Sequence, residues 1–184
     1  MLSLAPLLFA ALLSGASNAP LPASVTLDAP TRHVRTTSRS ITKLLARGYQ
    51  RSPTLAAIIT KLQHSDVFVY IEDVPRLPGA LEGRLMMLPR AHEARYVRIQ
   101  IALRGAPEDT IALLGHELQH ALEASQAPTL RNVGEYERYF RSIGIDREPK
   151  RLDTLAARQT GRQVADELRG MARPRGAVAL ASTN

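Results

Sequence analysis

Two histidines one helical turn apart are the residues of this 184-residue chain that are best suited to chemistry. They are His116 and His120, and Glu117 lies between them in the sequence His-Glu-Leu-Gln-His. The i, i+4 spacing places both imidazoles on one face of a helix, where they can bind one zinc ion. The carboxylate of Glu117 then lies beside the ion and can accept a proton from a zinc-bound water. The motif therefore predicts a zinc hydrolase site with two imidazole ligands and Glu117 as the general base.

The helix that must carry this motif is predicted to begin at Pro107 and to run to about Ala124. Proline suits the first position of a helix, and Glu108 and Asp109 follow in the first turn, where the helix dipole favours acids. Apolar residues occupy the side opposite the histidines: Ile111, Leu114, Leu118 and Leu122. The helix is therefore expected to bury one side and to present the two histidines on the other.

The other elements follow from hydrophobic periodicity and from turn residues. Helices are predicted over residues 40–49, 52–64, 129–143 and 153–169, and strands over 67–72, 81–88 and 94–103. Ser52 is expected to cap the second helix, with Pro53 as its first residue. This order of helices, strands and helices predicts an α+β fold with a short, mostly antiparallel sheet packed on helices.

Composition limits the chemistry that is possible. The chain has no cysteine and five histidines, so a metal must be held by nitrogen and oxygen ligands. The net charge of +7 suggests a basic nucleic-acid-binding protein as a third hypothesis. Because the arginines are dispersed and only eight residues are aromatic, a nucleic-acid partner is not expected. His33, His64 and His92 have no partner at ligand spacing and are expected at the surface.

With these residues the chain resembles the zincin metallopeptidases, whose active-site helix carries His-Glu-x-x-His and follows a β-sheet. The resemblance covers residues 67–170 and centres on the residues around His116. It implies a zincin-like fold, a Zn²⁺ cofactor, and hydrolysis of peptide or protein substrates by a zinc-activated water. In zincins an edge strand of the sheet pairs with the substrate, and the strand over 94–103 is the candidate here.

The resemblance also requires a third protein ligand, and no histidine follows His120. The ligand is therefore expected to be a carboxylate. The segment Leu152–Ala157 is similar to a second signature of small secreted bacterial proteins with this motif, in which an acid-Thr-x-Ala-Ala stretch begins a helix. That signature implies Asp153 as the ligand, although it usually presents glutamate.

Three alternatives to this assignment stay open. Glu135 or Glu137 could be the third ligand, and Asp153 could simply cap the helix that follows it.

A second donor to the oxyanion is expected from Tyr136, Tyr139 or an arginine. A further hypothesis keeps the zincin fold but makes the protein a binding or regulatory module without turnover.

The first residues of the chain resemble a secretory signal. No ionisable side chain precedes Asp28, and residues 4–16 are almost entirely apolar but too few to span a membrane. Cleavage is expected after Ala16, Ala19 or Ala23, and an uncleaved anchor is the alternative. The predicted organisation is a signal peptide over 1–23, a flexible segment over 24–40, the zincin-like domain over 41–170 and a disordered tail over 171–184. The mature protein would be secreted or periplasmic, with no stable membrane span.

Overall fold

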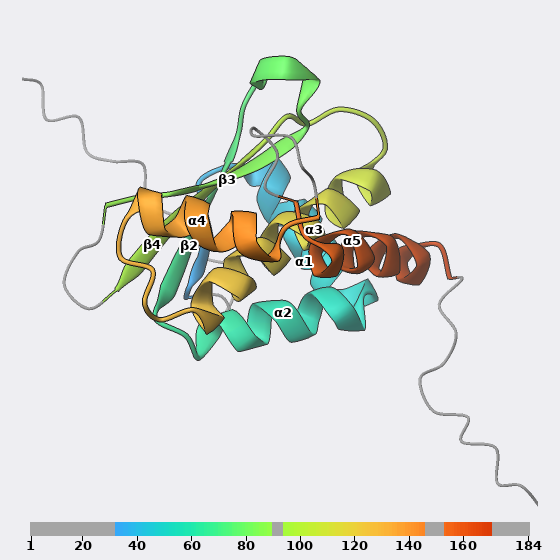
Figure 1. Cartoon of the computed structure of the whole chain (residues 1–184). Coiled ribbons are helices and arrows are strands. Elements are labelled where there is room, and N and C mark those ends of the chain that lie inside the picture. Colours follow the sequence, from blue (N-terminus) through green and yellow to red (C-terminus); the bar gives the residue numbers. More distant parts are fainter. Residues whose placement is uncertain (1–31, 90–93, 146–152, 171–184) are drawn as a thin grey trace, which may run out of the picture.

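The computed structural model describes residues 32–89, 94–145 and 153–170, which form five α-helices, one short 3-10 helix and a four-stranded sheet (Figure 1). In chain order the elements are β1 (Val34–Thr36), α1 (Arg39–Arg51), α2 (Pro53–Gln63), β2 (Val67–Asp73), η1 (Pro78–Ala80), β3 (Gly83–Met87), β4 (Arg95–Ile101), α3 (Pro107–Gln126), α4 (Val133–Ile143) and α5 (Leu155–Leu168). The predicted α+β class and the predicted order of the larger elements are confirmed.

The sheet has the strand order β1-β2-β4-β3, and only its last pairing is antiparallel. Strand β1 runs parallel to β2, and β2 runs parallel to β4. The prediction of a mostly antiparallel sheet is therefore wrong. Periodicity identifies a strand but not its partner, and helices α1 and α2 together form the crossover that parallel strands require.

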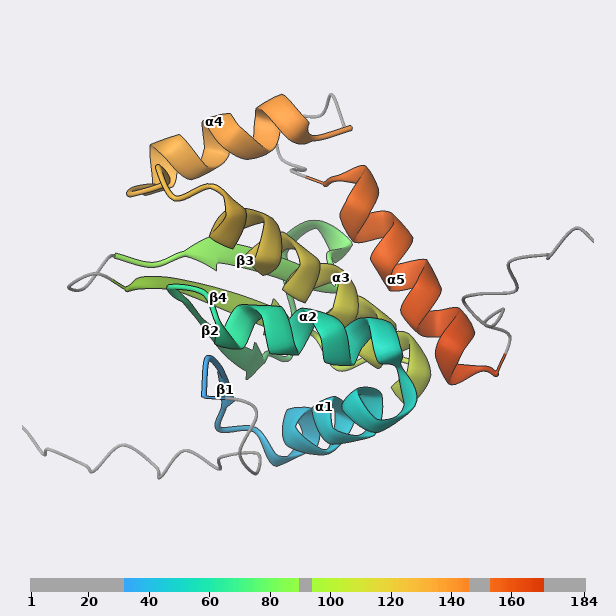
Figure 2. The same ribbon diagram turned by 90° about the horizontal axis from the view of Figure 1, so that it is seen from below.

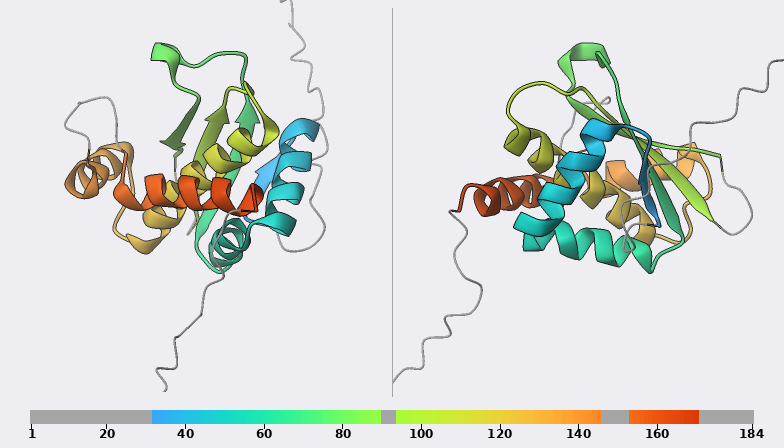
Figure 3. Two further views of the ribbon diagram at one scale, coloured as in Figure 1. Left: turned by 90° about the vertical axis from the view of Figure 1, so that its right-hand side faces the viewer. Right: turned by 180° about the vertical axis from the view of Figure 1, so that it is seen from behind.

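One face of the sheet packs against helices and forms the core. Along β4, Val97, Ile99 and Ile101 are buried, whereas the residues between them are only half-buried. Figure 3 shows α1, α2 and α3 on one side of the strands, and Figure 2 shows α4 apart from α1 and α2, beyond α3. The apolar side of α3, including Leu114 and Leu118, lies fully buried in this core. The sheet therefore holds α3 with its opposite side free to form a site.

Local signals set the ends of the helices. Ser52 caps α2 by accepting a hydrogen bond from the Leu55 amide, with Pro53 at the first position as predicted. At the C-terminal end of α3, the buried guanidinium of Arg95 donates to the carbonyl oxygens of Ala124 and Ala127 at 2.7 and 2.8 Å. Strand β4 therefore holds the C-terminal end of α3 in place, because this arginine adds hydrogen bonds to carbonyls in the last turn and cap of the helix.

One prediction about the strands needs correction. The strand over 94–103 was expected at an edge, but β4 lies between β2 and β3, and the edge strands are β1 and β3. The described part of the segment over 24–40, which was predicted to be flexible, contains β1 and the start of α1. Strand β1 is only three residues long, too short for an alternating pattern to indicate it.

The predicted signal peptide over 1–23 and the predicted tail over 171–184 lie outside the described residues. Within the described ranges, no helix combines the length and the apolar character that crossing a membrane requires.

Candidate metal centre

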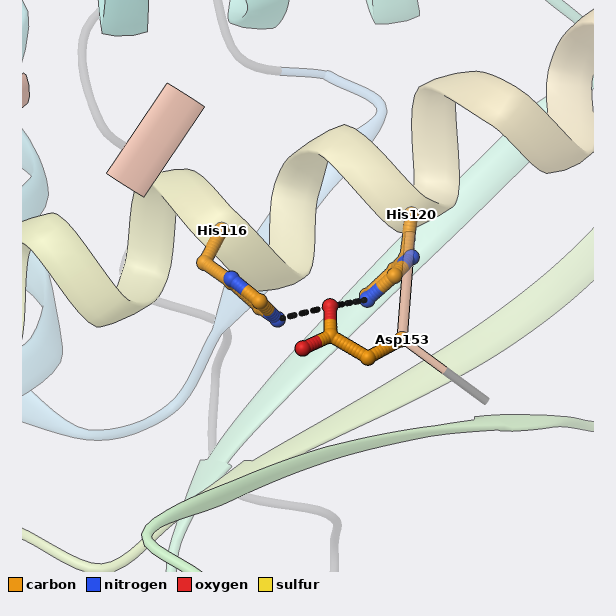
Figure 4. A group of neighbouring side chains, drawn as sticks. All are labelled: His116, His120 and Asp153. Atoms are coloured by element: carbon orange, nitrogen blue, oxygen red, sulfur yellow. Dashed lines mark ion pairs between the residues drawn. The ribbon is translucent and has the colours of Figure 1, made fainter. Parts of the chain in front are cut away.

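Helix α3 presents His116 and His120 on its free side, as their spacing predicted (Figure 4). Asp153 approaches them from the segment that leads into α5, and the Nε2 atoms of both imidazoles face its carboxylate. Asp153 Oδ1 lies 3.4 Å from His116 Nε2 and 3.8 Å from His120 Nε2. One ligand atom from each residue lies within 4.8 Å of the others. Two nitrogens and one oxygen thus converge as a three-ligand site requires.

The Asp153 carboxylate uses its two oxygens differently. Oδ2 accepts a hydrogen bond of 2.6 Å from Nε of Arg158, one turn along the chain. Oδ1 is buried and has no hydrogen-bond partner, although it faces both imidazoles. A buried carboxylate oxygen without a donor is costly, and a cation between the three side chains would satisfy it. The donor set of two imidazoles and one carboxylate fits zinc.

Helices α3 and α5 approach closely enough to bring Asp153 to the two histidines, because small residues lie between the helices. A Cβ atom at Gly161 of α5 would lie 3.4 Å from His116 Cβ, and one at Gly115 would lie 2.9 Å from Val164 Cγ2. Glycine at these two positions lets the helices meet beside the histidines. The start of α5 is thereby held against the motif.

His116 is held in the neutral state that a metal ligand needs. Burial lowers the pKa of His116 and the neighbouring His120 lowers it further, against the opposing effect of Asp153. A hydrogen bond to the carbonyl of Ala157 also opposes the shift without reversing it. The lowered pKa favours the uncharged imidazole, whose lone pair is available to a metal.

Glu117 lies beside the ligands in a buried position. Glu117 is 5% exposed, and burial raises the pKa of its carboxyl group to about 7. The neighbouring His120 lowers the pKa of Glu117, and Asp153 adds to the rise. A carboxyl group with this pKa can both accept and release a proton near neutral pH, as a general base that later acts as an acid must do.

The site opens into a pocket of about 950 Å³. One wall is the edge strand β3 with the residues before it, from Leu81 to Met86. The motif residues also line the pocket, as do Tyr136 and Glu137 of α4. The cluster is therefore accessible from a cavity next to an edge strand.

The structure separates the alternatives for the third ligand. The Glu135 carboxylate accepts a hydrogen bond of 2.6 Å from the Arg131 amide, in the capping arrangement that begins α4. Glu137 lines the pocket but does not join the three-residue cluster found among the described residues. The cap of α5 is Thr154, which accepts from the Ala157 amide, so the proposed capping role of Asp153 is wrong.

The candidates for a second oxyanion donor also differ in position. Tyr136 and the arginines Arg84 and Arg158 line the pocket, whereas Tyr139 is not among the lining residues. Burial raises the pKa of Tyr136 well above its ordinary value, so its hydroxyl stays protonated and can donate. The other two histidines that the structure describes are not part of the cluster. His64 is exposed, His33 stacks on Phe68, and His92 lies outside the described residues.

Sequence reasoning missed four residues that support the site. Gly83, Glu123 and Arg158 lie against the motif residues or Asp153, and Thr154 donates a hydrogen bond to Glu123. Glu123 follows His120 by three positions, a spacing that places both on one helical face and could have suggested their contact. Gly83 gave no such signal, because its position depends on the strand pairing.

Comparisons of the chain with protein-family models, curated proteins and solved structures found no significant match. The functional conclusion is therefore drawn from the geometry of the site.

Proposed function

We propose that this protein is a zinc-dependent metallopeptidase with a zincin-like active site. The observation that carries the proposal is the convergence of His116 Nε2, His120 Nε2 and Asp153 Oδ1, an oxygen that has no hydrogen-bond partner, with Glu117 beside them. A zinc ion held by these three side chains would supply a Lewis acid that acidifies a water molecule and polarises a carbonyl group.

Glu117 is the general base in this proposal. Its carboxylate accepts the proton of the attacking water and returns that proton to the leaving amine, and its pKa of about 7 suits both steps. Tyr136 is the preferred second donor to the oxyanion, because it lines the pocket and retains its proton.

The substrate class follows from the wall of the pocket. Strand β3 is an edge strand of the sheet, and its residues border the same cavity as the motif. An extended peptide can add to such an edge through main-chain hydrogen bonds, which places its carbonyl groups in the pocket. The proposal therefore assigns β3 the substrate-pairing role first predicted for the strand over 94–103. A secreted or periplasmic location belongs to the same proposal.

Metal analysis and hydrolysis together test this function. The purified chain should bind about one zinc per molecule, and His116→Ala and His120→Ala should each lose it. Glu117→Gln should retain the zinc and lose about 100-fold or more of the chelator-sensitive hydrolysis of an unfolded protein. The Gln variant is the matched control, since it preserves the shape of the side chain.

Each result has a distinct meaning. A wild-type protein that binds no metal contradicts the proposal at its first step. Zinc binding without hydrolysis would instead favour the binding or regulatory module, and full activity in Glu117→Gln would remove Glu117 as the base.

A further inference from the structure

A buried carboxylate connects the motif helix to the start of α5. Glu123 is 6% exposed, and each of its oxygens has its own partner. Oε2 lies 3.0 Å from Nδ1 of His120, and Oε1 accepts a hydrogen bond of 2.7 Å from the Thr154 hydroxyl. Glu123 therefore joins two residues that come from different elements of the chain.

The contact with Glu123 determines which nitrogen of His120 carries the proton. A carboxylate only accepts hydrogen bonds, so Nδ1 of the imidazole must be the protonated nitrogen. In the neutral ring this leaves the lone pair on Nε2, which is the atom that faces Asp153. The contact also limits rotation of the ring, and Phe140 restricts it further by an edge-on contact with ring centroids 5.5 Å apart.

The Thr154 hydroxyl is held in place because it accepts one hydrogen bond and donates another. It accepts a hydrogen bond of 3.1 Å from the Ala157 amide as the cap of α5, and it donates its only proton to Glu123. Thr154 is 2% exposed and directly follows Asp153. The position of the third ligand is therefore coupled to the orientation of His120.

We propose that Glu123 and Thr154 are positioning residues that set the tautomer and orientation of His120 and align it with Asp153 for metal binding. This inference rests on the proposed function, because it assumes that the three-residue cluster holds the metal. Neither residue touches the substrate or the reacting atoms in this proposal.

The affinity of the purified chain for zinc, measured by competition with a chromophoric chelator, tests the inference. Glu123→Met removes the acceptor and should weaken zinc binding about 10- to 100-fold, whereas Glu123→Gln keeps an acceptor and should fall between that variant and wild type. Thr154→Val should also weaken binding, and Thr154→Ser, which keeps the hydroxyl, should restore it. Glu137→Gln is the control, because it neutralises a carboxylate in the same pocket that lies outside the cluster.

A second measurement does not need the metal. Long-range ¹H–¹⁵N correlation spectra of the metal-free protein, at a pH where the imidazoles are neutral, report which nitrogen of His120 is protonated. Wild type should show the Nδ1–H form, and Glu123→Met should shift toward the Nε2–H form. The spectra also show whether each variant is folded.

The two measurements separate the inference from the proposed function. Wild type in the Nδ1–H form without zinc binding would contradict the proposed function and still support the part of the inference in which Glu123 sets the tautomer of His120. Zinc binding in Glu123→Met within about threefold of wild type, or an Nε2–H form in wild type, would overturn the inference.

Discussion

Gly83 on the edge strand leaves the space that the Glu117 carboxylate occupies. A Cβ atom built at Gly83 would lie 2.6 Å from Glu117 Oε1 and 3.1 Å from Leu113 Cδ1. The first of these distances is too short for a real contact, so a side chain at position 83 must displace the carboxylate. Because the carboxylate is the far end of a flexible side chain, this displacement is possible without unfolding the protein.

Gly83→Ala should therefore affect catalysis more than folding or metal binding. We expect hydrolysis to fall about 10- to 100-fold, since small misplacements of a reacting group have effects of this size. The zinc content and the melting temperature should stay close to those of wild type. The measurement is kcat/KM with a peptide substrate, together with metal analysis.

The matched control is the same substitution in a chain that already lacks the base. In Glu117→Gln, a further Gly83→Ala change should have little added effect, because both act on one group. Full activity in Gly83→Ala alone would show that the carboxylate does not need its present position.

The sequence predicted the residues of the cluster better than the residues that support them. The spacing of His116 and His120 is a local property of a helix, so it could be read directly. Asp153 was reached through a resemblance, and the structure brings it to the two histidines. The roles of Gly83 and Thr154 depend on contacts between distant segments, which no local pattern encodes.

At the scale of elements, helix α5 contacts its neighbours at both ends. Near its C-terminal end, Glu167 accepts hydrogen bonds from the hydroxyl groups of Ser52 and Thr54, at 2.5 and 2.6 Å, and from the Thr54 amide. These residues form the first turn of α2 and its cap. Glu167 therefore fixes α5 against α2, while the other end of α5 lies at the metal cluster.

This contact should make stability depend on pH. Burial raises the pKa of Glu167, but the hydrogen bonds from Ser52, Thr54 and Gln163 outweigh it and hold the pKa below its ordinary value of 4.5. A lowered pKa stabilises the folded state above pH 4.5, and this contribution is lost as the pH falls through the folded-state pKa. Glu167→Gln should therefore reduce the free energy of unfolding at pH 7 and have less effect at low pH.

Urea unfolding of both chains at pH 7 and below pH 4 measures the difference. Asp166→Asn, at an exposed neighbouring position, is the control for a general loss of negative charge. An equal destabilisation by Glu167→Gln at both values of pH would contradict the electrostatic account.

The boundaries of the elements show what local signals can and cannot predict. Caps and first-turn residues placed the starts of α2 and α3 correctly. The helix predicted over 129–143 begins instead at Val133, because Asn132 accepts from the Glu135 amide and caps it. Several polar residues in that stretch could have capped a helix, and only the fold selects one of them.

At the scale of the whole molecule, the metal would join segments that are far apart in the chain. His116 and His120 belong to the core helix, and Asp153 precedes a helix that packs along it. A ligand that binds only the folded protein raises the free energy of unfolding, by about 2.7 kcal/mol at a free concentration of 100 times Kd. The cluster should therefore link the stability of the molecule to the zinc concentration.

Thermal unfolding with zinc and with excess chelator measures this link. Wild type should melt at a higher temperature with zinc, and His120→Ala should melt at the same temperature in both. A wild-type melting temperature that does not respond to zinc would contradict specific binding to the folded state.

The parallel pairing of the sheet was the largest feature that sequence patterns did not predict. Alternation along residues 97–101 correctly indicated a strand with one buried face. It could not indicate that β4 lies between β2 and β3, because that order depends on how the chain returns after α2. The edge of the sheet, and with it the wall of the pocket, was therefore assigned to the wrong strand.

The three side chains of the candidate metal cluster come from residues 116–120 and 153, and α4 comes from the chain between them. Helix α4 packs Phe140 on the ring of His120 and contributes Tyr136 and Glu137 to the pocket. The exposed residues of α4 can therefore vary without replacing a residue of the cluster, whereas a change at Phe140 reaches the cluster directly.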